Sequence, residues 1–177
     1  MNIFILDLDP KIAASYHNDT HVNKMILETA QLLCTAHHIC GHGAPYKKTH
    51  ENHPCAIWAR KSQANYKWLA DLGLALCQEY TFRTGNEHKT QKIIEWASMP
   101  PSLPNLGLTP FALAMPDEHK FTDVVAAYRS YYATKIGYEM RGKFKYYKWS
   151  RRKPPDWYLS KTHLPISLFL GKYHESV

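Results

Sequence analysis

The chain has 177 residues, of which 45% are hydrophobic and 21% charged, and its net charge is +7 with the histidines neutral. This length and composition predict one globular domain over residues 1–177, with a core that needs no metal or disulfide, and no apolar run is long enough to span a membrane. Asp7 and Asp9 interrupt the apolar N-terminus where an export signal would continue. We therefore expect a cytoplasmic monomer that uses no cofactor and has no membrane partner.

The first 40 residues predict an extended segment followed by two helices. Residues 1–8 are apolar, and Asp9-Pro10 is typical of the start of a short helix that runs to about Tyr16. Asn18 begins a cap for a long helix without Gly or Pro before Gly41. Its apolar residues cover more than half of the circumference, which leaves a narrow polar strip of His17, Thr20, His21, Lys24, Glu28, Gln31, Thr35 and His38.

This polar strip is too narrow for an ordinary solvent-facing side, so we interpret it as the lining of a pocket. Glu28 is the candidate acid/base residue, and His21 and Lys24 are its candidate catalytic partners at helical spacing. We assign His17 and Gln31 to substrate or DNA contact. The alternative is a solvated Lys24–Glu28 ion pair without a catalytic role.

The following loop and helix start form a second polar cluster. We interpret it as a phosphate and base contact beside the Glu28 strip, and the alternative is a surface loop with one helix cap. Cys40 and Cys55 lie near several histidines, which makes zinc conceivable, but the spacing lacks the usual close ligand pairs and we predict no metal. The candidate binding residues are Tyr46, Lys47, His50, Asn52, His53, Trp58 and Arg60.

The remaining pattern predicts a second long helix over residues 54–84, from Pro54 to the stop at Gly85, packed on the first. A shorter helix follows at 88–97, then a proline-rich segment at 99–116 that lies on the core, a helix near 121–135 and an irregular aromatic tail. The fold class is therefore all-α: one compact domain of two long packed helices plus shorter helices and long proline-rich and aromatic loops.

The basic excess is concentrated in "RGKFKYYKWSRRK", residues 141–153, which holds seven basic residues and no acid. Aromatic residues alternate with the charges, a combination that indicates nucleic acid, since cations bind phosphates and flat rings stack on unpaired bases. The alternative is a basic tail whose aromatic rings fold onto the core. The candidate DNA-binding residues here are Lys145, Lys148, Trp149, Arg151 and Arg152.

Three stretches carry a resemblance to the phage pyrimidine-dimer DNA glycosylases of the endonuclease V type: "DTHVNKMILE", "NYKWLADLGLALCQEYTFRTG" and the end "KYYKW...PPDWY". The resemblance implies an all-α fold in which the N-terminal segment passes between long helices and presents its amine beside Glu28. In that family the amine attacks the deoxyribose C1′ and forms an imine, while the glutamate handles charge and proton transfers. His21 would then contact the DNA or sugar.

The chain departs from that family's pattern at three positions. Asn2 is expected to leave Met1 in place, although the family's amine is exposed by removal of the initiator, and Leu27 and Gln31 stand where the family has arginines. We therefore keep three hypotheses. The first is a phage glycosylase, with or without lyase activity, acting on a damaged or modified pyrimidine in double-stranded DNA. The second is a transferase that joins an amino acid or amine to an activated 5-modified thymine. The third is a non-catalytic nucleic-acid binder.

Either enzyme must take its target base out of the duplex stack, which requires an apolar wedge. On the sequence, Trp58 or the segment 109–116 is the candidate wedge.

Overall fold

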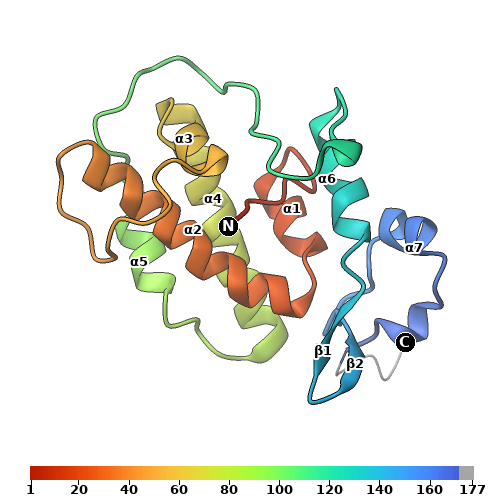
Figure 1. Ribbon diagram of the computed structural model, residues 1–177. Coiled ribbons are helices and arrows are strands. Elements are labelled where there is room, and N and C mark those ends of the chain that lie inside the picture. Colours follow the sequence, from red (N-terminus) through yellow and green to blue (C-terminus); the bar gives the residue numbers. More distant parts are fainter. Residues whose placement is uncertain (172–177) are drawn as a thin grey trace.

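The computed structural model describes residues 1–171, and the chain is predominantly helical (Figure 1). Two long helices, α2 and α4, pack against each other and form the centre of one half of the molecule. The described elements are α1 (Pro10–Tyr16), α2 (Asp19–Ile39), α3 (Pro54–Ala59), α4 (Gln63–Thr84), α5 (Gln91–Trp96), the 3-10 helix η1 (Asp117–His119), α6 (Val124–Ala133), β1 (Gly137–Met140), β2 (Lys143–Tyr146), α7 (Asp156–Thr162) and the 3-10 helix η2 (Ile166–Leu168). The all-α prediction is confirmed.

The first two helices begin at the predicted caps. Asp9 accepts a hydrogen bond from the Lys11 N–H at 2.7 Å, with Pro10 in the first turn of α1, and Asn18 Oδ1 accepts from the His21 N–H at 2.8 Å. These side chains satisfy backbone donors that the first turn of a helix leaves free. The predicted boundaries of α1 and α2 are therefore confirmed to within a few residues.

The predicted single helix over residues 54–84 is wrong, because the chain breaks at residues 60–62 into α3 and α4. Ser62 is extended (φ −151°, ψ 160°), and its hydroxyl caps α4 by accepting from the Asn65 N–H at 3.1 Å. The Asn65 side chain in turn donates to the Trp58 carbonyl at 2.8 Å. The break is stable because side chains satisfy backbone groups on both sides of it.

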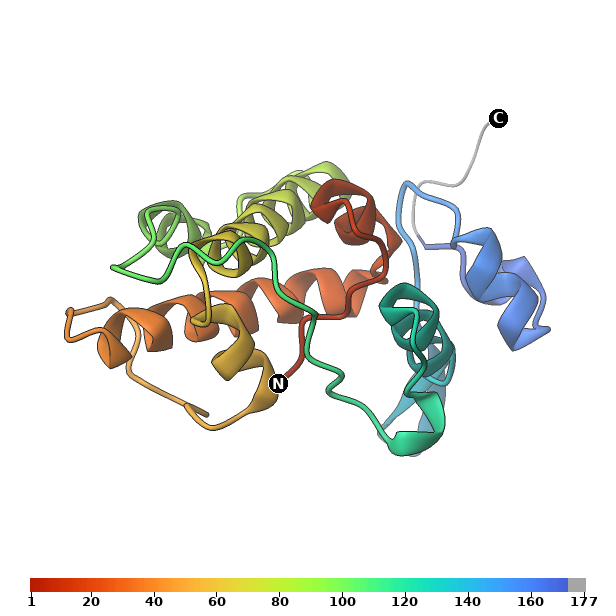
Figure 2. The same ribbon diagram turned by 90° about the horizontal axis from the view of Figure 1, so that it is seen from above.

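The N-terminal segment passes between two halves of the molecule, one built on α2 and α4 and the other on α6 and the segments that follow it (Figure 2). Ile3, Ile5 and Leu6 are fully buried. The Leu6 carbonyl accepts from Arg129 on α6, and the Leu8 carbonyl accepts from the Trp68 indole on α4. Because both halves bind its backbone, this segment fixes α6 relative to the long helices.

The chain after α4 departs from the prediction at α5 and in the tail. α5 is shorter than the predicted 88–97 helix, because residues 88–90 form a turn in which the Thr90 N–H donates to the His88 ring. The proline-rich segment 99–116 is irregular, as predicted. The tail holds elements that we did not predict: α7 and an antiparallel β1–β2 hairpin, whose turn residues Arg141 and Gly142 both have positive φ (52° and 72°). Positive φ at both positions is typical of a two-residue hairpin turn.

A buried ion-pair cluster attaches the C-terminal segment to the helices. The Arg83 guanidinium, on α4, contacts Glu79 at 2.6 Å and Asp19 at 2.9 Å. Glu79 also pairs with Arg152, and Asp19 accepts from both the backbone N–H and the hydroxyl of Ser150. The residues that follow the hairpin are therefore held on α2 and α4 by charge-assisted hydrogen bonds.

Candidate active site around Glu28

Glu28 lies on α2 where the N-terminal backbone meets it. Its Oε2 accepts a hydrogen bond from the Asn2 N–H at 2.9 Å and lies 3.9 Å from the Met1 amine. Its Oε1 lies 3.4 Å from Lys24 Nζ. The Glu28 side chain is 12% exposed, whereas that of Lys24 is 62% exposed, so only the lysine end of this pair is largely solvated. The Lys24–Glu28 pair exists, but it is not the simple solvated pair of the alternative interpretation.

A cavity of about 250 Å³ opens beside this carboxylate. Four separate parts of the chain form it: the N-terminus, α2, the end of α6 and the residue that follows β2. The lining residues are Met1, Asn2, Phe4, His21, Lys24, Met25, Glu28, Tyr131, Lys135 and Tyr147. The Lys135 ammonium lies 4.3 Å from the centre of the Tyr131 ring. The cavity therefore combines one carboxylate with an amine, two lysines and aromatic walls.

His21 contributes a neutral ring to this cavity. Burial is the main cause that lowers its pKa to about 3, and the neighbouring His17, Lys135 and Lys24 lower it further. Its Nδ1 lies 2.8 Å from the Tyr132 hydroxyl and 3.0 Å from the Asn18 amide nitrogen. The Asn18 amide oxygen already accepts from the His21 backbone, so the amide nitrogen donates to Nδ1 and the ring proton lies on Nε2. The ring can therefore donate a hydrogen bond to a bound molecule without being charged.

Aromatic neighbours hold the His21 ring in place. The Phe4 ring stacks on it, with ring centroids 5.2 Å apart. The centroid of the Tyr147 ring lies 5.1 Å from that of His21, and the two ring planes are inclined at 45°. Phe4 has a positive φ of 38°, an uncommon conformation for a residue with a side chain. The backbone turn at Phe4 thus brings the N-terminal residues onto Glu28 while its ring covers His21.

His17 does not belong to the cavity, contrary to the prediction. Its ring is completely buried and its Nδ1 hydrogen-bonds the Ala13 carbonyl at 2.7 Å. It cannot contact DNA from this position. Gln31 lies one turn beyond Glu28 and lines a separate surface cavity of about 510 Å³ with Leu27, Tyr46, Lys47, Lys48 and Thr49. Gln31, Tyr46 and Lys47 are thus brought together, but beside the Glu28 cavity and not inside it.

The other candidate binding residues between positions 41 and 60 differ in their burial and in their contacts. His53 caps α3 by accepting from the Cys55 N–H at 3.2 Å, and burial is the main cause that lowers its pKa. It does not line the Glu28 cavity. His50 and Asn52 are exposed. Arg60 donates to the Glu51 carbonyl at 2.7 Å and so holds the loop. Among residues 1–171 no cluster of three or more His, Cys, Asp or Glu side chains has the arrangement of a metal site.

Two aromatic candidates are in the core. Trp58 is 4% exposed and stacks on Phe111 with centroids 4.9 Å apart. Trp149 is fully buried, and its indole donates to the Tyr16 carbonyl at 3.0 Å. Neither ring can stack on a base, so these two assignments are corrected: the indoles are large and apolar and complete the core.

The basic segment divides into anchored and exposed residues. Arg152 pairs with buried Glu79, and the Lys148 ammonium donates to the Leu168 carbonyl at 2.7 Å. Arg151 donates to the Phe82 carbonyl at 3.1 Å, although its side chain is on the surface. Lys145 is exposed on β2. Arg152 and Lys148 therefore fix the C-terminal segment, which corresponds in part to the alternative of a tail folded onto the core.

The sequence interpretation missed Phe4, Asn18, Tyr131, Tyr132 and Lys135. Tyr131 and Lys135 are four residues apart in the sequence predicted as helix, so the available signal was a shared face, although α6 ends at Ala133 and Lys135 follows it. It did not reveal that the face meets Glu28.

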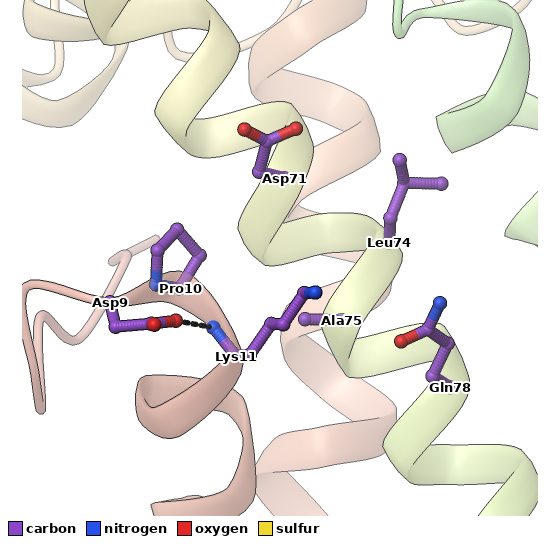
Figure 3. Close-up of a pocket in the computed structure, with 7 residues that line it drawn as sticks. All are labelled: Asp9, Pro10, Lys11, Asp71, Leu74, Ala75 and Gln78. Carbon is purple, nitrogen blue, oxygen red and sulfur yellow. Dashed lines mark hydrogen bonds between the residues drawn. The ribbon is translucent and has the colours of Figure 1, made fainter.

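A larger cavity, of about 450 Å³, lies between the start of α1 and the outer side of α4 (Figure 3). Its two carboxylates already have partners: Asp9 caps α1, and Asp71 pairs with Lys67 at 3.2 Å. The Glu28 cavity has the better chemical case, because its polar groups are partly buried and converge on one carboxylate.

Comparisons with known proteins add no family. No protein-family model matches the chain, and neither a curated protein nor a solved structure matches it. Among the helices of residues 1–171, none has both the length and the apolar character that a membrane span requires.

Proposed function

We propose that the protein is a DNA-acting enzyme of the pyrimidine-dimer glycosylase type, which removes a damaged or modified pyrimidine base at the Glu28 cavity. The observation that supports this most is the N-terminal backbone on Glu28, with the Asn2 nitrogen at 2.9 Å and the Met1 amine at 3.9 Å from Oε2. An unprotonated α-amine can act as a nucleophile toward the sugar.

In the proposed reaction, the amine forms a bond to the deoxyribose C1′ while the bond from C1′ to the base breaks. The departing base takes up one of the two protons that the amine loses. The sugar then opens to an imine as the bond from C1′ to O4′ breaks and O4′ takes up the other proton. Glu28 is positioned to accept a proton from the amine and to stabilise positive charge at C1′. The neutral His21 ring can donate a hydrogen bond from Nε2 to the sugar or the base, and Lys24 and Lys135 favour the flanking phosphates.

A transferase is the second candidate, favoured by the two lysines of the cavity. Lys24 and Lys135 both line it, and two ammonium groups suit a phosphorylated substituent on the base better than a plain pyrimidine dimer. In that reaction an amino acid or amine would replace the phosphate-bearing group at the 5-substituent, and Glu28 would accept the proton that the incoming amine loses.

One experiment separates the candidates. Duplexes carrying dimerised, hydroxymethylated or pyrophosphorylated pyrimidines are incubated with the protein, with and without a mixture of amino acids and polyamines, and digested to nucleosides for mass analysis. Loss of a base supports the glycosylase, and replacement of the pyrophosphate by an amine supports the transferase. Unchanged nucleosides in every sample would contradict both.

The nucleophile has its own test. Borohydride reduces an imine to a stable amine, so it should link the protein covalently to DNA that contains an abasic site. Peptide mapping should then find the adduct on the N-terminal peptide, and an adduct on Lys24 or Lys135 would contradict the assignment of the amine.

A further inference from the structure

The β1–β2 hairpin extends from the C-terminal half of the molecule (Figure 1) and exposes large apolar side chains. Tyr138 is 39% exposed, Met140 41% and Phe144 49%. Its second strand also carries Lys143, next to the turn, and Lys145, and both are exposed. Aromatic and apolar side chains beside lysines on one hairpin are typical of a surface that contacts both bases and phosphates.

The strand register divides these side chains between two faces. Tyr138 is opposite Lys145, and Met140 is opposite Lys143, while Glu139 is opposite Phe144. Partners across an antiparallel pair share a face, and successive residues alternate. One face, which we call the lysine face, therefore carries Tyr138, Met140, Lys143 and Lys145. Phe144 and the hairpin's carboxylate, Glu139, are on the other.

The lysine face continues into the wall of the Glu28 cavity. Tyr147 follows Lys143 and Lys145 at intervals of two residues, and its N–H extends the strand pairing by donating to the Ile136 carbonyl at 3.0 Å. Its ring lies 5.6 Å from that of Tyr138 and 5.1 Å from that of His21. A continuous row of rings thus leads from the hairpin to the cavity.

The charges along this path suit a nucleic-acid backbone. Lys143 and Lys145 lie on the hairpin, and Lys24 and Lys135 line the cavity at its end. The carboxylate of Glu139 is turned away from the path. A strand that follows the lysine face therefore meets cations at both ends.

We propose that the lysine face is the element that opens the DNA duplex, an inference that rests on the proposed function. Met140 and Tyr138 enter the base stack beside the target, Lys143 and Lys145 bind the adjacent phosphates, and the extruded nucleotide passes Tyr147 into the Glu28 cavity. Of the wedges predicted from the sequence, Trp58 is buried. In the segment 109–116 the large Phe111 ring already packs against Trp58 and Trp68, with ring centroids 4.9 Å from each.

The test compares two variants of the same hairpin. One is a double variant that carries both Tyr138→Ser and Met140→Ser on the lysine face, and the other is Phe144→Ser on the opposite face. Each protein acts on the modified pyrimidine in a duplex and in a single strand, after circular dichroism and thermal melting have shown that it is folded. The double variant should lose roughly tenfold or more of the duplex turnover, because unstacking is no longer compensated, and less than about threefold on the single strand. Phe144→Ser should match the parent on both.

A second measurement does not depend on chemistry. In a Glu28→Gln background, 2-aminopurine placed next to the target reports unstacking by a rise in fluorescence. The protein with an intact lysine face should produce the rise and the double variant should not. Absence of the rise with the intact face would overturn the proposal even if the enzyme is active.

The remaining outcomes are also decisive. Equal losses on duplex and single strand would make the lysine face a simple binding surface, and an unchanged double variant would exclude any role, so both overturn the proposal. Fluorescence unstacking without turnover of any substrate by the parent protein would keep the opening role and remove the proposed glycosylase or transferase chemistry.

Discussion

The role proposed for the Glu28 side chain can be tested by changing its charge alone. Replacement by Gln keeps its size and leaves one oxygen to accept from the Asn2 N–H, while it removes the negative charge that faces the Met1 amine. We predict that Glu28→Gln folds and loses about a hundredfold or more in turnover, as lost acid/base catalysis typically does. Mass analysis of reaction products and a thermal melt measure the two effects.

The control for this variant is Glu118→Gln, at an exposed position in η1. Like Glu28→Gln, it removes one negative charge from the protein, but it leaves the cavity unchanged. Parent-level turnover by Glu28→Gln, or an equal loss in both variants, would contradict the assignment of Glu28.

Two buried histidines make stability depend on pH. Burial is the main cause that lowers the pKa of His17 to about 4 and that of His21 to about 3, from an ordinary 6.5. The unfolded chain therefore binds more protons than the folded one below pH 6.5. The free energy of unfolding falls as the pH drops from about 6.5 toward 4, by about 1.4 kcal/mol per pH unit for each histidine.

Urea denaturation between pH 7.5 and 4.5 measures this slope. His17→Gln should roughly halve the part of the slope that the two rings cause, whereas His163→Asn, at an exposed position with positive φ that Asn tolerates, should leave it unchanged. An identical slope in the His17 variant would show that this ring does not stay neutral in the folded state.

The residues of the candidate site were only partly predictable. Helical spacing brought His21, Lys24 and Glu28 together correctly, since residues three and four apart share a face. The same argument placed His17 beside them wrongly, because His17 precedes the cap at Asn18 and is not in the helix. Phe4 and Lys135 are 131 positions apart in sequence, and only the tertiary fold brings them into one cavity.

At the scale of elements, local signals located helix starts better than interruptions. Asp9 and Asn18 are recognisable caps, and Gly85 is a recognisable stop with φ 75°. The break at residues 60–62 contains neither Gly nor Pro, so nothing in the hydrophobic pattern marks it. The hairpin was missed because charges hide its alternation, and its strands are only 4 residues each.

The buried ion-pair cluster at Arg83 joins α2, α4 and the segment after the hairpin. The Arg83 side chain is 2% exposed and that of Glu79 is 6% exposed. We predict that Arg83→Met lowers the free energy of unfolding by roughly 3–5 kcal/mol, because it leaves the Glu79 carboxylate buried with one fewer partner. Urea denaturation at pH 7 measures the change.

The matched control is Lys67→Met, which breaks an exposed i,i+4 pair on the same helix, where the lysine side chain is 73% exposed. It should cost less than about 1 kcal/mol. A cost of that size for Arg83→Met as well would mean that packing, and not the ion pairs, holds the C-terminal segment.

Across the whole molecule, the excess of positive charge serves two purposes that the sequence did not separate. Arg83 and Arg152 neutralise buried carboxylates inside the fold, whereas Lys143 and Lys145 remain on the surface near the candidate site. A count of basic residues therefore overstates the charge that a ligand meets. Only basic side chains that reach the surface can release counterions from DNA when the protein binds.

This distinction predicts how DNA binding responds to salt. The affinity of the parent protein should fall steeply as salt rises, and Lys143→Ser combined with Lys145→Ser should make the slope of log affinity against log salt shallower by about 2, close to one per lost phosphate contact. The control, Lys92→Ser with Lys67→Ser, removes two exposed charges from α5 and α4. Fluorescence anisotropy with labelled duplex between 50 and 300 mM salt measures both slopes. Equal slopes in the two double variants would show that the protein binds DNA through its overall charge, and the hairpin would then have no special place in the interface.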